Sequence, residues 1–231
     1  EILRQLERDD PDIAGLFVNG FDFWVEGAGR IIGGNTRLKV LLIVIDNDVG
    51  EDSWLDELCR ELSHNRSIEC LEIHVRCQLQ LRLDTFRILA PFLERNSQLR
   101  CITLSHNHPQ SQTFNSMVSV LSNCKIGRLE CIEVFCCVTG IDDEQSAEFF
   151  EALSHHCYLS KLAYGGPVER MGSKALANVL KSSSPNLVEL RLIPSHVMDD
   201  LCVAIIVDAM IQNRTLISIE ICENTMEKAG W

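Results

Sequence analysis

Positive charge is scarce in this sequence, and long apolar runs are absent from it. Lysine and arginine together number 21 against 33 aspartates and glutamates, which leaves a formal net charge of −12. A nucleic-acid partner requires a basic surface, so we expect none. The longest apolar run, residues 40–45, is far shorter than the ~18 residues of a membrane-spanning helix. We therefore expect no membrane insertion.

Cysteine, in contrast, is plentiful, with eleven residues. In a small secreted domain such a count would indicate a disulfide framework. Most of these cysteines instead occupy recurring positions of a repeat, where a free thiol serves as a small apolar or half-exposed side chain. We therefore expect reduced cysteines and a cytoplasmic protein.

One short apolar pattern recurs along almost the whole chain. It has the spacing L-x-x-L-x-L and starts at Ile13, Leu38, Ile68, Leu99, Leu129, Leu159, Leu187 and Leu216. From Leu38 onward the starts lie 28–31 residues apart, and the apolar residues between them follow a helical period. A strand and a helix repeated at a fixed period predict a solenoid. Because a helix is wider (~10 Å) than the strand spacing (~4.8 Å), the solenoid must curve.

The expected fold is therefore α/β, a right-handed horseshoe with about eight parallel strands on the concave face and helices on the convex face. Asp142 and Asp199 precede helical segments and can cap them. Asparagines recur near the helix ends, where we expect left-handed backbone geometry: Asn65, Asn96, Asn123 and Asn213. The glycines of segment 27–34 disfavour the short helix that its apolar residues suggest.

The repeat resembles the leucine-rich repeat, and its length and full helices resemble the ribonuclease-inhibitor-like class. The stretches LSHNRSIECLEI, LERNSQLRCITL and MIQNRTLISIEI carry this resemblance most clearly. It implies one array over residues 1–231, which we expect to be a segment of a longer array because no polar capping repeat is evident. The family also has a buried polar ladder, which only Asn107, Cys137 and Asn224 fit here, and which Pro167 should interrupt.

The strand positions that point away from the helices define the expected binding face. Side chains alternate along a strand, so the residues between and just after the inward triplet lie on the concave side. We predict partner binding by Phe17, Val40, Leu42, Val44, Cys70, Glu72, His74, Cys101, Thr103, Cys131, Glu133, Phe135, Lys161, Glu189, Arg191 and Glu220. Glutamates outnumber basic residues in this set, which favours a basic partner.

Two groups within this face are distinctive. The strand at 38–45 is apolar on both sides and lies beside Phe17, which indicates a contact surface unless the glycine-rich segment folds over it. Cys70, Cys101 and Cys131 form a column of thiols beside His74, and these are metal-ligand types. One strand step of ~4.8 Å exceeds the ~3.8 Å separation of sulfurs on a tetrahedral zinc. We therefore expect half-exposed thiols and no metal or cofactor.

These patterns favour a non-enzymatic protein-binding module, because a curved sheet offers a large rigid surface for a partner. We expect no catalytic residue, since no nucleophile, base and orienting group are brought together by the repeat. Two alternatives remain. One is a GTPase-activating protein of the Ran-activator type, which the family resemblance suggests by fold analogy alone. The other is the sensor portion of a larger immune or signalling receptor.

Overall fold

The computed structural model describes residues 2–19, 27–45, 53–75, 85–106, 111–123, 128–136, 141–182, 187–194 and 198–222. The strands in these ranges are β1 (Gly15–Asn19), β2 (Val40–Ile45), β3 (Cys70–Val75), β4 (Cys101–His106), β5 (Cys131–Cys136), β6 (Lys161–Gly165), β7 (Glu189–Leu192) and β8 (Ser218–Ile221). The helices are α1 (Ile2–Glu7), α2 (Ala28–Gly34), α3 (Ser53–Leu62), α4 (Thr85–Arg95), α5 (Ser111–Asn123), α6 (Asp143–Leu153), α7 (Arg170–Lys181) and α8 (Asp200–Gln212).

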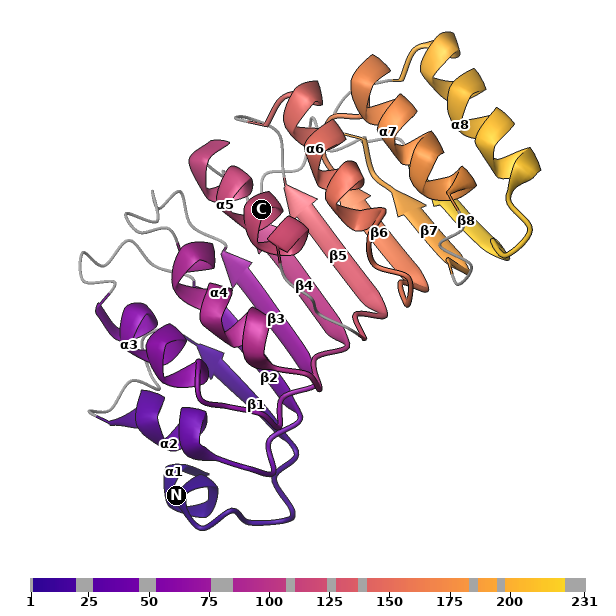
Figure 1. The fold of residues 1–231 in the computed structure, drawn as a ribbon. Coiled ribbons are helices and arrows are strands. Elements are labelled where there is room, and N and C mark those ends of the chain that lie inside the picture. The colour runs from indigo at the N-terminus through magenta and orange to yellow at the C-terminus, as the bar shows by residue number, and fades with distance from the viewer. Residues whose placement is uncertain are drawn as a thin grey trace.

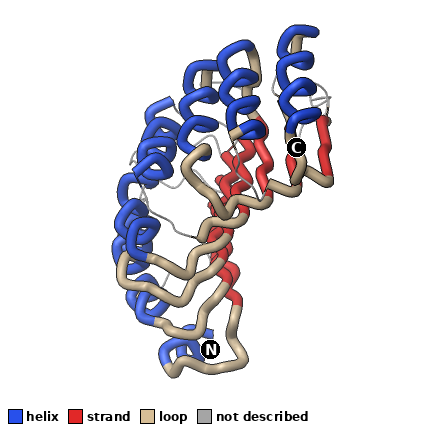
Figure 2. The backbone as a smooth tube through the Cα atoms, turned by 45° about the vertical axis from the view of Figure 1, so that its right-hand side comes forward, coloured by secondary structure: helices blue, strands red, loops and turns tan. Residues whose placement is uncertain are grey.

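The eight strands form one sheet in sequence order, and each strand pairs in parallel with its neighbours. The helices form a single layer on one side of this sheet, each packed against the next (Figure 1). In Figure 2 the strands line the inner side of the arc and the helices its outer side. The predicted α/β solenoid, with eight parallel strands on its concave side and helices on its convex side, is confirmed.

The inward positions of the repeated pattern build the core. Leu41, Leu71, Ile102 and Leu190 are each buried at the middle apolar position of their strands. They belong to one continuous cluster that runs along the array between the sheet and the helices. The core is therefore a stripe, as expected when each repeat buries its apolar face against its neighbours.

The glycine-rich segment does form a helix, α2. A Cβ at Gly33 would lie 2.5 Å from the backbone oxygen of Glu61 in α3. The missing side chain therefore allows the two helices to approach closely. Glycine at position 33 disfavours a helix locally, but the close packing of α2 against α3 requires it.

The asparagines at the helix ends do not have left-handed backbone geometry, and that expectation is wrong. Among the described residues other than glycine, Asp9 alone has a positive φ. Asn65 is buried, and its Oδ1 accepts hydrogen bonds from the backbone N–H groups of Ser67 (2.9 Å) and Ile68 (3.0 Å). Its Nδ2 donates to the backbone oxygen of Asn35 in the preceding repeat (2.8 Å).

Three further asparagines connect neighbouring repeats in the same way. Asn35 donates to the backbone oxygen of Leu6, and Asn96 donates to that of Ile68. The Oδ1 of each also accepts a hydrogen bond from the backbone N–H group two residues further along the chain. Asn213 repeats this arrangement. The asparagines therefore satisfy backbone groups of two repeats at once, which is a requirement for buried turns.

Both helix caps that the sequence predicts, Asp142 and Asp199, are present. Asp142 caps α6 through a reciprocal capping box with Gln145, and Asp199 caps α8. The neighbouring Asp143 instead reaches the next repeat, where its Oδ1 accepts from the backbone N–H of Gly172 at 2.9 Å. A Cβ at Gly172 would lie 2.8 Å from that oxygen, so glycine makes room for the cap.

Three of the positions at issue for the buried polar ladder, Asn107, Cys137 and Asn224, lie outside the described residues. Within the part of the chain that the structure describes, no helix combines the length and apolar character needed to cross a bilayer.

Candidate functional site

The parallel register arranges the outward-facing side chains in rows across the strands. The first row contains Gly15, Val40, Cys70, Cys101, Cys131, Lys161, Glu189 and Ser218. The second contains Phe17, Leu42, Glu72, Thr103, Glu133, Ala163, Arg191 and Glu220. The third includes Asn19, Val44, His74, Ser105, Phe135 and Gly165. All predicted binding residues therefore lie on one side of the sheet, which we call the concave face.

An apolar patch lies at the β1–β2 end of the concave face. Phe17 is 58% exposed and Val40 is 39% exposed, while Leu42 between them is partly buried. We call these three residues the apolar patch. Exposed large apolar side chains on adjacent strands are typical of a contact surface.

Val44 does not contribute accessible surface, contrary to the prediction. It is only 3% exposed and lies between Asn19 and His74 of the neighbouring strands. A short side chain between two longer ones, ~4.8 Å away on each side, leaves little room for a partner.

The alternative that the glycine-rich segment covers the apolar patch does not hold for the part that is described. Ala28–Gly34 form α2, which packs with α1 and α3 in the helix layer. That layer lies on one side of the sheet (Figure 1). The patch lies on the other side, because its side chains alternate along the strands with the buried residues that face the helices. Residues 20–26 lie outside the described residues.

Two of the four predicted glutamates of the concave face form ion pairs with lysine or arginine. Glu133 forms an ion pair with Lys161 on the next strand (2.7 Å), and this contact raises the pKa of Lys161. Arg191 pairs with Glu220 at 3.0 Å. Glu72 lies 3.4 Å from His74, and Glu189 is exposed. The acidic character that sequence reasoning assigned to this face is therefore partly neutralised within it.

A further charged row borders the concave face and was missed in the sequence analysis. Lys39 pairs with Glu69 at 2.9 Å, and Arg100 pairs with Glu130 at 2.9 Å. Each of these residues directly follows the first apolar residue of its repeat. The alternation of basic and acidic residues at that repeat position could therefore have predicted the ion pairs. Because these pairs are largely exposed, each contributes little to stability.

The centre of the concave face is less open than its ends. Phe135 packs over β6, since a Cβ at Gly165 would lie 3.3 Å from its ring. Ala163 and Gly165 are both buried, and Thr103 is partly buried. β6 therefore offers little accessible surface apart from Lys161.

The three predicted thiols are neighbours in the first row. Cys101 is the direct partner of Cys70 on one side and of Cys131 on the other, and all three are partly buried. Hydrogen bonds from the thiols of Cys131 and Cys70 lower the pKa of Cys101 well below that of an ordinary thiol. The same contacts raise the pKa of the two outer thiols.

Metal binding has no support in the part of the chain that is described. No group of three or more histidine, cysteine, aspartate or glutamate side chains there is arranged to hold a metal ion. Glu72 and His74 face each other next to Cys70, yet this set does not close into a site.

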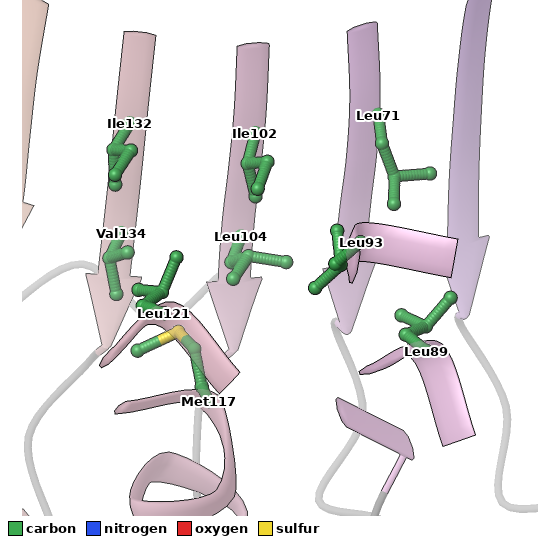
Figure 3. Close-up of a pocket in the computed structure, with 9 residues that line it drawn as sticks. All are labelled: Leu71, Leu89, Leu93, Ile102, Leu104, Met117, Leu121, Ile132 and Val134. Carbon is green, nitrogen blue, oxygen red and sulfur yellow. The ribbon is translucent and has the colours of Figure 1, made fainter. Parts of the chain in front are cut away.

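A small cavity of about 10 Å³ lies inside the core, away from the concave face. It is enclosed between the sheet and helices α4 and α5 (Figure 3). Its lining is entirely apolar: Leu71, Leu89, Leu93, Ile102, Leu104, Met117, Leu121, Ile132 and Val134. A bound water would need polar partners, so we interpret this cavity as a packing gap and not as a ligand site.

A second apolar surface lies at the β8 end of the array. Ile219 and Ile221 occupy inward positions, yet they are 38% and 45% exposed. Leu190 and Leu192, their partners on β7, are fully buried. Within the described residues, the core stripe is therefore exposed at this end.

Comparison with known proteins gave similarity to solved structures only. No protein-family model and no curated protein matches the sequence. One similar structure is titled as actin-binding site 2 of leiomodin-1, with 15% identity and a TM-score of 0.45 over 70% of this chain and 76% of that one. Another is the C-terminal domain of tropomodulin from Caenorhabditis elegans, with 10% identity and a TM-score of 0.46 over 91% of this chain and 90% of that one.

Proposed function

We propose that this protein is a non-enzymatic protein-binding module whose concave face holds the partner. The observation that carries the proposal is the apolar patch, in which Phe17 and Val40 project from adjacent strands into solvent. The backbone of both strands is held by the parallel sheet, so the patch is rigid before the partner arrives. A preorganised apolar surface binds with a smaller loss of conformational entropy.

The partner that fits this face has an apolar anchor and a mixed polar rim with a slight excess of positive charge. The concave rows and the row bordering them carry six glutamates against two lysines and two arginines. Because most of these charges are paired internally, electrostatics should affect the association rate and the choice of partner more than the strength of the complex. Partly exposed free thiols on the same face fit a reducing, cytoplasmic location.

The test compares two valines of matched exposure. Val40 lies in the apolar patch at 39% exposure, and Val203 lies on α8 in the helix layer at 38% exposure. Partners captured by the intact chain are identified by mass spectrometry, and their affinities are then measured for Val40→Asp and Val203→Asp. A hot-spot residue contributes about 2 kcal/mol or more, so Val40→Asp should weaken binding by about 30-fold. Val203→Asp should leave it unchanged.

Two results would contradict the proposal. If Val203→Asp abolishes binding while Val40→Asp does not, the partner binds the helix layer. If neither substitution changes the affinity of any captured protein, the apolar patch is not a contact surface. Circular dichroism of both variants separates lost binding from lost folding.

We also infer that the array continues beyond β8, as expected from the repeat. The support is the exposure of Ile219 and Ile221 at positions that are buried in the other strands. In a solenoid, each added repeat contributes an interface with its neighbour. A version of the chain extended by one further repeat should therefore unfold at higher urea and protect the β8 amides from hydrogen exchange. Unchanged stability and exchange would contradict this inference.

A further inference from the structure

Three cysteines form a row of adjacent thiols on the concave face. Cys70, Cys101 and Cys131 are direct register partners on β3, β4 and β5. Each is partly buried and each is a free thiol. Their side chains lie on the outward side of the sheet, where small molecules in solution can reach them.

The surroundings of the middle thiol differ from those of the outer two. The sulfur of Cys70 lies 3.8 Å from the Oε1 of Glu72, and the sulfur of Cys131 lies 3.9 Å from the Oε1 of Glu133. Each outer thiol therefore has a carboxylate two residues further along its own strand, and the negative charge of that carboxylate disfavours the thiolate there. The corresponding residue on β4 is Thr103, which has no charge.

Positive charge lies near the middle thiol. The hydrogen bonds from Cys131 and Cys70 are the largest influences that lower the pKa of Cys101, and the charges of Arg100 and Lys161 lower it further, although burial opposes them. Each cation also forms an ion pair: Arg100 with Glu130, which directly precedes β5, and Lys161 with Glu133 of β5. A thiolate is the nucleophilic form of cysteine, and the arrangement favours the thiolate at the middle position.

We propose that Cys101 is a site of reversible oxidation by peroxides, and that a neighbouring thiol converts the product into a disulfide between adjacent strands. The Cys101 thiolate attacks one peroxide oxygen, and the O–O bond breaks. Cys101 becomes a sulfenic acid, and the departing hydroxide takes a proton to form water. The thiol of Cys70 or Cys131 then attacks the Cys101 sulfur, which releases the hydroxyl group as a second water. The protein has lost two electrons to the peroxide.

The strand spacing limits which disulfides can form. In-register neighbours on adjacent strands lie ~4.8 Å apart, which is within the Cα separation of 4.4–6.8 Å found in disulfides. Cys70 and Cys131 are two strand steps apart, ~9.6 Å, which is too far. Each oxidised molecule therefore contains Cys101 joined to one neighbour, with the third thiol left over. Because the Cβ atoms must approach more closely than the sheet spacing, the bond should be readily reduced.

This proposal goes beyond the binding function and is tested without any partner. The intact reduced chain is treated with hydrogen peroxide, and its disulfides are mapped by mass spectrometry. We expect the loss of two hydrogen atoms and a bond from Cys101 to Cys70 or Cys131, reversed by a thiol reductant. Cys101→Ser should abolish this disulfide. The control is Cys157→Ser, at an exposed cysteine between α6 and β6, which should leave the disulfide unchanged.

The double variant Cys70→Ser/Cys131→Ser provides a second measurement. It lacks both resolving thiols, so oxidation should stop at a Cys101 sulfenic acid that a dimedone probe traps. The proposal is overturned if the intact chain forms no Cys101 disulfide, if Cys70 and Cys131 become joined, or if the double variant gives no probe adduct at Cys101.

Alkylation by iodoacetamide at pH 6 tests the nucleophile itself. An ordinary thiol with a pKa of ~8.5 is only ~0.3% thiolate at this pH. A thiol that is largely ionised gains ~300-fold in thiolate, but its lower intrinsic nucleophilicity offsets much of that gain, so the pH dependence of the rate is the discriminating measurement. An ordinary thiol gains ~80-fold in thiolate between pH 6 and pH 8, whereas we expect the alkylation rate of Cys101 to rise by less than ~10-fold over this range. A rise of ~10-fold or more would overturn its assignment as the reactive thiol.

Discussion

Replacing Asn65 by alanine tests whether the asparagines that link neighbouring repeats stabilise the array. The Oδ1 of Asn65 accepts from the backbone N–H groups of Ser67 and Ile68, and all three residues are buried. Alanine leaves both N–H groups without this acceptor. The backbone oxygen of Asn35, which also loses a donor, keeps a hydrogen bond of 3.0 Å from the Ser67 hydroxyl. The loss therefore concerns two buried donors.

An unsatisfied buried donor costs about 1–3 kcal/mol, so the loss of the acceptor for two donors in Asn65→Ala should lower the free energy of unfolding by about 2–6 kcal/mol. Urea denaturation measures this as a lower midpoint with an unchanged slope. Hydrogen exchange should become faster first at the Ser67 and Ile68 amides, because the lost acceptor served them. The matched control is Asn178→Ala, at an exposed position of α7, which should change stability by at most about 0.5 kcal/mol.

A loss below about 1 kcal/mol for Asn65→Ala, no larger than that of the control, would refute the reasoning. It would mean that water replaces the asparagine oxygen at this turn and that the links between repeats add little stability. A large loss without faster exchange at Ser67 and Ile68 would instead place the effect elsewhere in the molecule.

Three further predictions follow from the core and the helix caps. Leu190→Ala should cost about 2–5 kcal/mol in a denaturation experiment, the range for a fully buried leucine; a near-zero cost would mean that the side-chain register of β7 is wrong. Asp143→Ala should lower the free energy of unfolding by about 1–2 kcal/mol as a lost cap. Hydrogen exchange should become faster at Gly172 while α6 stays protected. Faster exchange in α6 alone would mean that Asp143 caps its own helix and not α7. Hydrogen bonds from the Cys202 side chain and backbone lower the pKa of Asp199 from 3.8 in the folded protein. The contribution of Asp199 to stability is therefore fully present above pH 3.8. It is lost as the pH falls through the folded-state pKa. Asp199→Asn should therefore reduce the pH dependence of stability in that acid range, and an unchanged acid titration of stability would count against this cap.

The sequence by itself determined the architecture of this protein. The spacing L-x-x-L-x-L states which side chains of each strand face the helices, and its recurrence every 28–31 residues states which residues of successive strands are neighbours. Both are local or periodic properties, so they can be counted without coordinates. The row of Cys70, Cys101 and Cys131 was predictable for this reason, as was the exposure of Phe17 and Val40. The pairing of Lys39 with Glu69 could have been found in the same way.

Only the tertiary structure decided how polar atoms connect one repeat to the next. Asn65 reaches a backbone oxygen 30 residues away, and Asp143 reaches a backbone N–H 29 residues away. The repeat indicates that these segments are neighbours, but the direction of each side chain depends on the distance and tilt between the stacked layers. The same dependence explains why Gly33 supports a helix and why Val44 is buried on the face that was expected to be open. Apolar burial follows the period of the sequence because it is non-directional, whereas hydrogen bonds are directional and need the assembled geometry.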